Sequence, residues 1–433
     1  MSVARFLYSC LTWAAQPLLR RKLRRRAQQE PGYGVAVAER FGRYTPKNLG
    51  ADGRGQWLWV HAVSLGETRA AAILIDALRA KHPRMRLLLT HGTATGRAEG
   101  QKLLREGDLQ VWQPWDTVGA TRRFVKQFRP AAGVLMETEI WPNLLAACAK
   151  AGVPVALANA RLNIKSQRGA QRLAWLMQPA YRSLRAIWAQ TTDDAQRLRS
   201  LGVEVDAVLG NLKFDVVPDM RLLQLGQQWA LHAPKPIVVF ASSREGEEAM
   251  LLQALAQLPR EQMQRVQWMV VPRHPQRFNE VQQLVEKAGW TVSRRSQWSD
   301  GTPKSADVWL GDTMGEMHLY YGMSQIGLLG GSFAPLGGQN LIEAAACGCP
   351  MLLGPHTFNF ADAAEQAIAA GAVQRVENME QAVQTALACV AQAEPLLRMQ
   401  QHAQDFAAAH RGAAAATAQW VLEMMAGITP PRE

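Results

Sequence analysis

Residues 56–90 read QWLWVHAVSLGETRAAAILIDALRAKHPRMRLLLT, and this stretch decides the fold class. It begins with the apolar run Gln56–His61, continues with a helical pattern over Thr68–Lys81, and ends with a second apolar run, Arg86–Thr90. A strand, a helix and a strand in this order are typical of a βαβ unit, in which the two strands are parallel. The stretch therefore predicts an α/β protein built on a parallel sheet.

The same alternation continues along the chain in two series. Further strands are expected at residues 110–112, 132–136, 153–159 and 186–190, and then at 236–241, 267–271, 306–310, 326–329 and 350–353. Gly210–Asp219 separates the series, and a helical stretch starts at Met220. At about 150 residues per domain, 433 residues suggest two or three domains. We therefore predict two Rossmann-like, doubly wound domains that face a cleft.

The predicted domains are an N-terminal segment over residues 1–26, a first Rossmann-like domain over 27–217 and a second over 218–433. The last domain ends in an Ala/Gln-rich helical stretch, about residues 394–426. This stretch could return to pack on the first domain.

The N-terminal segment carries much of the positive charge. The whole chain has a net charge of +12, and residues 1–26 contain seven Arg and Lys and no acid. An apolar run, Phe6–Leu19, precedes the basic residues and is interrupted by Pro17. The run is shorter than the roughly 20 apolar residues that span a bilayer. Its order, apolar then basic, predicts a membrane-associating helix on an anionic surface. The alternative is an amphipathic helix that caps the first domain.

Two classes of site are disfavoured by what the sequence contains. No zinc-finger, RNA-recognition or KH pattern is present, so we expect no nucleic-acid partner. Five cysteines are too few for a disulfide framework, and Cys347 and Cys349 lack a second pair at metal-ligand spacing. We therefore expect no bound metal.

In the first half, acids follow two of the predicted strands directly. Glu67 lies just after Gln56–His61, and Glu137 and Glu139 follow the run over residues 132–136. Glu67 could simply be a favourable acid in the first turn of a helix, or it could be a carboxylate base at a sheet edge. The pair Glu137 and Glu139 could likewise belong to a solvated loop, because acids near a core are costly unless they are solvated or paired.

In the second half, Arg273 and glycine-rich loops follow the strands. An Arg at a sheet edge suits phosphate or carboxylate recognition. Glycines in Gly311–Glu316, Gly330–Ser332 and Gly337–Ala345 would let backbone N–H groups approach an anion. Neither the Walker Lys-Ser/Thr nor a full G-x-G-x-x-G is present, so the ATPase and dehydrogenase classes are disfavoured.

Together these segments resemble the 3-deoxy-D-manno-octulosonic acid (Kdo) transferases of lipid A biosynthesis. The matching strings run in order over nearly the whole chain. They include HAVSLGET (61–68), METEIWPN (136–143), GNLKFD (210–215), VPRHPQRF (271–278), GDTMGE (311–316) and GGSFAPLGGQNLIEAAA (330–346).

The resemblance implies a GT-B fold, no metal or other cofactor, and transfer of Kdo from CMP-Kdo to lipid IVA. It also implies a location on the cytoplasmic face of the inner membrane. By motif, Glu67 matches the general base, and Glu137 and Lys213 match residues that support the transition state. The implied CMP site consists of Pro272, Arg273, Met314, Gly315, Glu316, Asn340, Leu341, Ile342 and Glu343.

The mechanistic hypothesis is a single displacement with one base, which inverts the anomeric centre. The first turn of a helix stabilises the Glu67 anion and lowers its basicity, whereas a base works best with a pKa near the operating pH. Burial could offset this effect. Lys213 could reach the donor carboxylate on domain closure. The alternatives are another GT-B nucleotide-sugar transferase or epimerase, and a non-enzymatic basic peripheral membrane protein.

Overall fold

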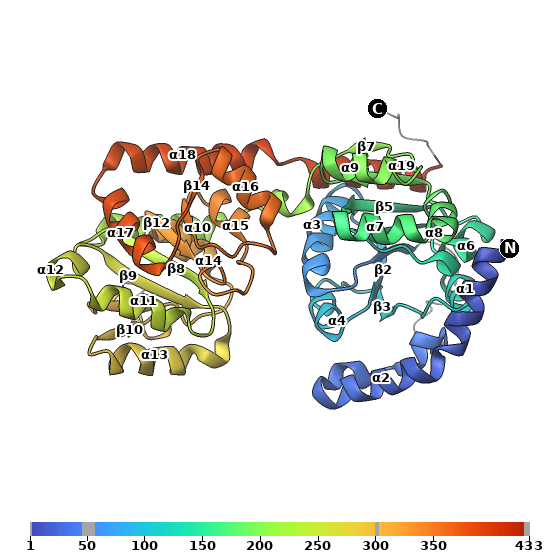
Figure 1. Cartoon of the computed structure of the whole chain (residues 1–433), viewed down its shortest axis with the longest axis horizontal. Helices are drawn as coiled ribbons and strands as arrows, with labels where there is room; N and C mark the ends of the chain where they lie inside the picture. Colours follow the sequence, from blue (N-terminus) through green and yellow to red (C-terminus); the bar gives the residue numbers. More distant parts are fainter. Residues whose placement is uncertain (1, 46–56, 299–302, 428–433) are drawn as a thin grey trace. The chain divides into compact units, whose positions relative to one another are not determined.

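The computed structural model describes residues 2–45, 57–298 and 303–427, and the chain divides into two compact units (Figure 1). The first unit comprises Met1–Asp215 and Arg411–Glu433, and the second comprises Val216–His410. Each unit is built on one seven-stranded sheet, and every strand pair is parallel. The predicted α/β fold with two doubly wound sheets is therefore confirmed.

The sheet of the first unit has the strand order β3-β2-β1-β4-β5-β6-β7. The order reverses between β1 and β4, which makes this pair the topological switch point where open α/β sheets bind ligands. Gln56, expected in the first strand, lies outside the described residues. The strands are β1 (Trp57–His61), β2 (Arg86–His91), β3 (Leu109–Trp112), β4 (Ala132–Met136), β5 (Val155–Ala160), β6 (Ala186–Ala189) and β7 (Ala207–Val208).

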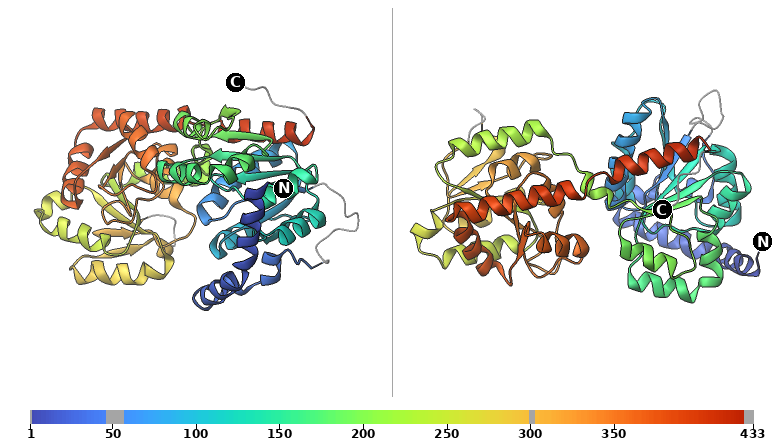
Figure 2. Two further views of the ribbon diagram at one scale, coloured as in Figure 1. Left: turned by 45° about the vertical axis from the view of Figure 1, so that its right-hand side comes forward. Right: turned by 90° about the horizontal axis from the view of Figure 1, so that it is seen from above.

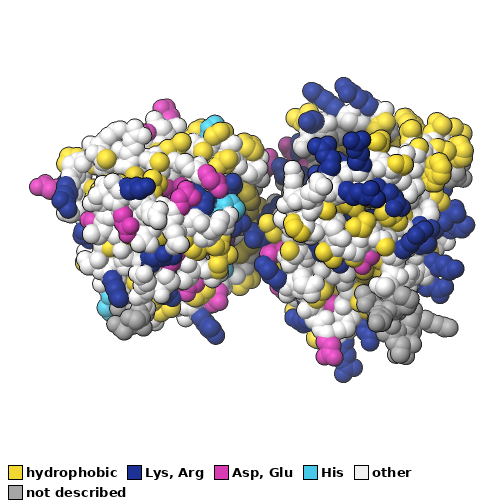
Figure 3. Space-filling view, turned by 90° about the horizontal axis from the view of Figure 1, so that it is seen from below, with side chains coloured by type: hydrophobic (Ala, Val, Ile, Leu, Met, Phe, Trp, Pro, Cys, Tyr) yellow, Lys and Arg dark blue, Asp and Glu magenta, His cyan; other side chains and the backbone are white. Residues whose placement is uncertain are grey.

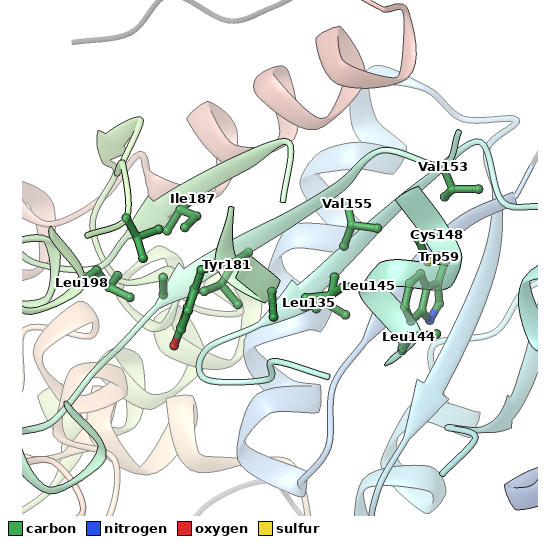
Figure 4. Close-up of a cluster of buried hydrophobic side chains, with 14 of the residues drawn as sticks. Trp59, Leu135, Leu144, Leu145, Cys148, Val153, Val155, Tyr181, Ile187 and Leu198 are labelled. Carbon is green, nitrogen blue, oxygen red and sulfur yellow. The ribbon is translucent and has the colours of Figure 1, made fainter. Parts of the chain in front are cut away.

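Helices pack on both faces of this sheet and enclose two apolar cores. One core joins the sheet to α5 and α6, and Figure 4 shows Trp59, Leu135 and Leu144 within it. The helices are α1 (Val3–Ala14), α2 (Gln16–Gln29), α3 (Leu65–Lys81), α4 (Ala94–Gln101), α5 (Val118–Phe128), α6 (Pro142–Lys150), α7 (Ile164–Arg172), α8 (Ala174–Tyr181), α9 (Thr192–Arg199) and α19 (Ala413–Met425).

The other core includes the C-terminal helix α19. Ala418 and Val421 of α19 are fully buried with Leu58 and Leu74 in this cluster, and Figure 2 shows α19 lying along the first unit. The expected single helix over residues 394–426 is wrong. Gly412, with φ of 109°, separates α18 (Ala393–Ala409) from α19, and the two helices belong to different units.

The N-terminal segment forms two helices where one was expected. Pro17 lies in the first turn of α2, where its missing N–H costs no helical hydrogen bond. Leu23 of α2 is buried against the first unit, whereas Val3, Leu11 and Trp13 of α1 are each at least 70% exposed. In the part of the chain that the structure describes, every helix is too short or too polar to cross a bilayer.

The second unit repeats the doubly wound plan with the strand order β10-β11-β9-β8-β12-β13-β14, and its switch point lies between β8 and β12. The strands are β8 (Ile237–Ser243), β9 (Gln267–Pro272), β10 (Val292–Arg294), β11 (Val308–Leu310), β12 (Ile326–Leu329), β13 (Met351–Leu353) and β14 (Val373–Arg375). Besides α18, the helices are α10 (Met220–His232), α11 (Glu247–Ala256), α12 (Arg260–Met263), α13 (Phe278–Lys287), α14 (Met317–Met323), α15 (Leu341–Ala346), α16 (Ala361–Ala369) and α17 (Met379–Val390).

Candidate active site

The three acids singled out in the first half lie at the switch point of the first unit. β1 and β4 are neighbours, and His61 at the end of β1 pairs in register with Leu135 of β4. The loops that follow these strands therefore leave the same edge of the sheet. One loop leads to Glu67 in α3, and the other carries Glu137 and Glu139.

Glu67 is half-buried in the first turn of α3. Its carboxylate accepts hydrogen bonds from the Val63 backbone N–H at 2.8 Å and from the Ser64 hydroxyl at 2.8 Å. These bonds favour the anion, but burial has the larger effect and raises the pKa of Glu67 above its usual value. The nearby charges of Glu139 and Glu137 raise this pKa further. Burial therefore offsets the stabilisation of the Glu67 anion by the helix, as a general base requires.

Glu137 is held by Lys213, although 76 residues separate them. The Lys213 ammonium donates to the Glu137 carboxylate at 3.0 Å, and both side chains are partly exposed. Glu137 has φ of 58°, a left-handed conformation that costs an ordinary residue roughly 1–2 kcal/mol. Both residues belong to the first unit, so the contact between Lys213 and Glu137 does not require domain closure.

The position of Lys213 depends on Asn159 at the end of β5. The Asn159 side chain accepts a hydrogen bond from the Leu212 backbone N–H at 3.0 Å. This bond fixes the short 3-10 helix Leu212–Asp215 that presents Lys213. Sequence analysis gave no role to Asn159.

Glu139 contacts two aromatic side chains. It accepts a hydrogen bond from the Trp141 indole N–H at 2.8 Å, and the His61 imidazole Nε2 lies 3.8 Å away. His61 is fully buried, and its Nδ1 lies 3.1 Å from the Thr90 carbonyl oxygen. Sequence analysis gave no role to His61, although a histidine at the end of an apolar strand was a visible signal.

In the second unit, Pro272 ends β9, and Arg273 follows it beside the glycine-rich loop after β12. The Arg273 guanidinium donates to the Gln339 side-chain carbonyl at 3.2 Å, and its backbone N–H donates to the Ser243 carbonyl at 2.9 Å. Gly330 is required here, because a Cβ at this position would lie 2.2 Å from the Ser242 carbonyl oxygen. The predicted phosphate-binding segments are therefore neighbours.

The remaining predicted donor-site residues lie in two loops of this unit. Met314 is 68% exposed and Gly315 has φ of 82°, while Glu316 accepts from the Arg295 guanidinium at 2.9 Å. Asn340 caps the first turn of α15 through the Ile342 N–H. Leu341 and Ile342 are fully buried, so only their backbone groups could serve a ligand.

Glu343 lies 3.3 Å from the His318 imidazole Nε2. The His318 Nδ1 accepts a hydrogen bond from the Asp219 backbone N–H at 3.1 Å, so in the neutral ring Nε2 carries the proton and points toward Glu343. Sequence analysis missed His318, which follows the GDTMGE string by only two residues.

Glu247 was also missed as a site residue. It is fully buried in the first turn of α11, and its two oxygens accept from four backbone N–H groups at 2.7–3.1 Å. Three of these donors, Gly331, Phe333 and Ala334, belong to the loop after β12. Glu247 therefore shapes the loop that was expected to bind phosphate.

Within residues 2–45, 57–298 and 303–427, no three His, Cys, Asp or Glu side chains are grouped so that they could hold a metal ion. Metal independence of the reaction remains a prediction.

Comparisons with known proteins agree on one family. Residues 36–216 match the family model described as 3-deoxy-D-manno-octulosonic-acid transferase (kdotransferase). A Bordetella pertussis 3-deoxy-D-manno-octulosonic acid transferase is 43% identical over 95% of this chain and 97% of its own. A Haemophilus influenzae protein of the same name is 30% identical over 88% of this chain and 90% of its own.

Among solved structures, a UDP-GlcNAc 2-epimerase from Neisseria meningitidis has a TM-score of 0.57 and 16% identity, covering 85% of this chain and all of its own. A glycosyltransferase from Rickettsia africae has a TM-score of 0.54 and 13% identity, covering 86% of this chain and 99% of its own. At such identities these likenesses show only the shared fold, which is of the GT-B type.

Proposed function

Because the chain belongs to the 3-deoxy-D-manno-octulosonic acid transferase family, a family of glycosyltransferases, we propose that it transfers Kdo from CMP-Kdo to lipid IVA with inversion of the anomeric centre. One observation carries this proposal. Glu67 is a half-buried carboxylate at the switch point of a parallel sheet, and its pKa is raised. A group with these properties suits general-base catalysis.

In the proposed reaction, Glu67 takes the proton of the acceptor hydroxyl while its oxygen forms a bond to the anomeric carbon of Kdo. The bond from that carbon to the CMP phosphate breaks, and CMP leaves with the electron pair. A single displacement of this kind inverts the centre. The raised pKa of Glu67 supports this role, because a weakly basic carboxylate would be a poor proton acceptor near neutral pH.

Lys213 and Glu137 would support the transition state as a pair. The donor sugar carries a carboxylate beside its anomeric carbon, and the Lys213 ammonium is a suitable cation for it. The 3.0 Å contact with Glu137 restricts the long Lys213 side chain before substrate arrives. A preoriented charge of this kind avoids reorganisation during the reaction.

The second unit would bind the CMP part of the donor. Arg273 would receive the phosphate, since the Gly331, Phe333 and Ala334 N–H groups of the loop after β12 already donate to Glu247. Glu343 would accept hydrogen bonds from the ribose hydroxyls. The contacts of Arg273 with Gln339 and of His318 with Glu343 support this assignment, because they hold both charged side chains in place. The proposed nucleotide site also contains Pro272, Met314, Gly315, Glu316, Asn340, Leu341 and Ile342.

We further propose that the enzyme works at an anionic membrane surface, on the cytoplasmic face of the inner membrane. Two observations support the attachment to a membrane surface, and the choice of membrane and face follows from the family resemblance. The α1 side chains Val3, Leu11 and Trp13 are exposed, and α2 exposes Arg21 and Arg25. Figure 3 shows Lys and Arg side chains gathered beside hydrophobic ones on one face of the first unit. Apolar and basic groups together suit an anionic bilayer.

The proposal is tested by incubating the chain with CMP-Kdo and lipid IVA and measuring the lipid by mass spectrometry. We expect a gain equal to one or more Kdo residues. An unchanged lipid mass would contradict the proposed reaction. Calorimetry with CMP and with UMP separates this function from that of a uridine-nucleotide transferase or epimerase, since only CMP should bind tightly.

A further inference from the structure

The loop that carries Glu137 and Glu139 continues without a break into α6. Trp141, which donates to Glu139, is the N-terminal cap residue of α6, and Asn143 lies in the first turn of this helix. The placement of the acids therefore depends on what fixes the start of α6. The residue Asp116 and the N-terminal helix α1, both distant in sequence, contact the start of α6.

Asp116 holds the first turn of α6 from inside the unit. Its carboxylate accepts from the Asn143 and Leu144 backbone N–H groups at 3.0 and 2.8 Å, and its carbonyl accepts from the Asn143 side-chain amide at 2.8 Å. Asp116 and Asn143 are each 4% exposed. These bonds satisfy N–H groups that the end of a helix leaves without intrahelical partners.

The helix α1 contacts both of these buried residues. The Ser9 hydroxyl lies 2.9 Å from the Asn143 side-chain oxygen, and it shares its proton between this oxygen and the Arg5 carbonyl at 2.6 Å. Tyr8 is half-buried, and the nearby Asp116 carboxylate contributes to raising the pKa of its hydroxyl. Burial raises the pKa of Asp116 to about 6, so the carboxylate depends on its hydrogen-bond donors.

The two sides of α1 therefore differ in polarity and in exposure. One side presents Tyr8 and Ser9 to the start of α6, while Val3, Leu11 and Trp13 are exposed. An anchor alone would need only the exposed apolar side. The half-buried Tyr8 and Ser9 contact Asp116 and Asn143 instead, and these contacts connect the segment to the loop that holds Glu137 and Glu139.

We propose that Tyr8 and Ser9 are positioning residues for the transferase reaction, which act by fixing Asp116 and Asn143 and thereby the loop over residues 137–143. This inference rests on the proposed function, because the loop matters for catalysis only if Glu137 and Glu139 flank the reacting groups. It gives the N-terminal segment a second role, independent of membrane attachment.

The test compares three full-length variants on lipid IVA dispersed in detergent, so that membrane attachment does not limit the rate. Tyr8→Phe with Ser9→Ala removes both hydroxyls and leaves the exposed apolar side unchanged. Ser9→Thr keeps a hydroxyl at position 9. Thr12→Val is the matched control, because the Thr12 hydroxyl donates to the Ser9 carbonyl within α1 itself.

We expect the double variant to lose about 5- to 10-fold in kcat with the KM for CMP-Kdo unchanged, since small misplacements of catalytic groups can cost up to about 100-fold. Ser9→Thr and the control should retain the wild-type rate. Amide hydrogen exchange should become faster at Asn143 and Leu144 in the double variant but not in α3. Binding to anionic vesicles should not change.

A double variant that matches Thr12→Val in kcat and in exchange at α6 would overturn the proposal. The mass of the lipid product and the hydrogen exchange in α6 also distinguish a failure of this proposal from a failure of the proposed function. If the wild-type chain leaves lipid IVA unchanged in mass, the reaction is wrong, and the exchange at Asn143 and Leu144 still decides whether α1 fixes this loop.

Discussion

The switch points of the two units place a glutamate at the same location but in different surroundings. Glu67 lies in the first turn of α3, the helix that follows β1. Glu247 lies in the first turn of α11, the helix that follows β8. Glu67 is half-buried with one backbone and one hydroxyl donor, whereas Glu247 is fully buried with four backbone donors.

The difference shows that position in a fold does not by itself give a carboxylate its role. Two oxygens offer about four lone pairs, and Glu247 uses all four on N–H groups. It has no acceptor capacity left for a substrate, so it serves as a structural support. Glu67 keeps lone pairs and some exposure, and it can accept a proton.

The largest effect should come from Glu67→Gln. Gln has the same size but cannot take the proton, so transfer should fall by at least 100-fold, within the range for general-base catalysis. CMP binding by calorimetry should persist, since every proposed nucleotide contact lies in the second unit. Glu106→Gln, an exposed acid of the same unit, is the control. Retention of more than about a hundredth of the wild-type rate would mean that Glu67 is not the base.

Glu247→Gln should lower the stability of the second unit. The amide NH2 group would face backbone N–H groups that now have no acceptor, which should cost about 2–3 kcal/mol of unfolding free energy in the second unit. Denaturant titration followed by hydrogen exchange in α11 measures this loss. Glu245→Gln, at a residue whose side chain is 54% exposed, should be close to neutral. Equal stability of the two variants would contradict the structural role of Glu247.

Arg273→Ala tests whether the second switch point binds the nucleotide. Losing a hydrogen bond to a charged phosphate should weaken CMP binding by about 1.5–3 kcal/mol. Calorimetry on the folded variant gives this value directly, and Arg265→Ala serves as a control from the same unit. Unchanged CMP affinity would place the phosphate elsewhere.

The smallest effect concerns the pH dependence of stability. Because the pKa of Glu67 is raised in the folded chain, the folded state binds a proton more readily than the unfolded state. The contribution of Glu67 to stability is therefore largest below its unfolded pKa of about 4.3. It is lost as the pH rises through the folded pKa.

The Tm of the wild type minus that of Glu67→Gln should therefore decrease from pH 4 to pH 8. A difference that grows over this range would show that the Glu67 pKa is lowered rather than raised.

The fold followed from the sequence where strands are long and central. Runs such as Ala132–Met136 are buried on both faces of a parallel sheet, so they read as continuous apolar segments. The strands that sequence analysis missed, β7, β10 and β14, have two or three residues and lie at sheet edges. The equally short β11 and β13 are fully buried and were predicted, whereas these three strands include exposed or half-buried residues and so leave no continuous apolar run.

The break between α18 and α19 depends on a distant residue. The Ala/Gln-rich pattern continues across residues 394–426, but the Asp215 carboxylate accepts from the Gly412 and Ala414 backbone N–H groups. These bonds start a new helix and join it to the first unit. No local pattern could show a contact over almost 200 residues.

The sequence by itself determined the fold class, the family and the identity of the candidate acids, because buried strands and loop glycines leave local patterns. Only the tertiary structure decided the surroundings of each acid. Lys213 reaches Glu137 from 76 residues away, and Glu247 collects N–H groups from a loop more than 80 residues further on. The protonation and hydrogen-bonding capacity of a carboxylate depend on such neighbours, and the folding of the chain brings them together.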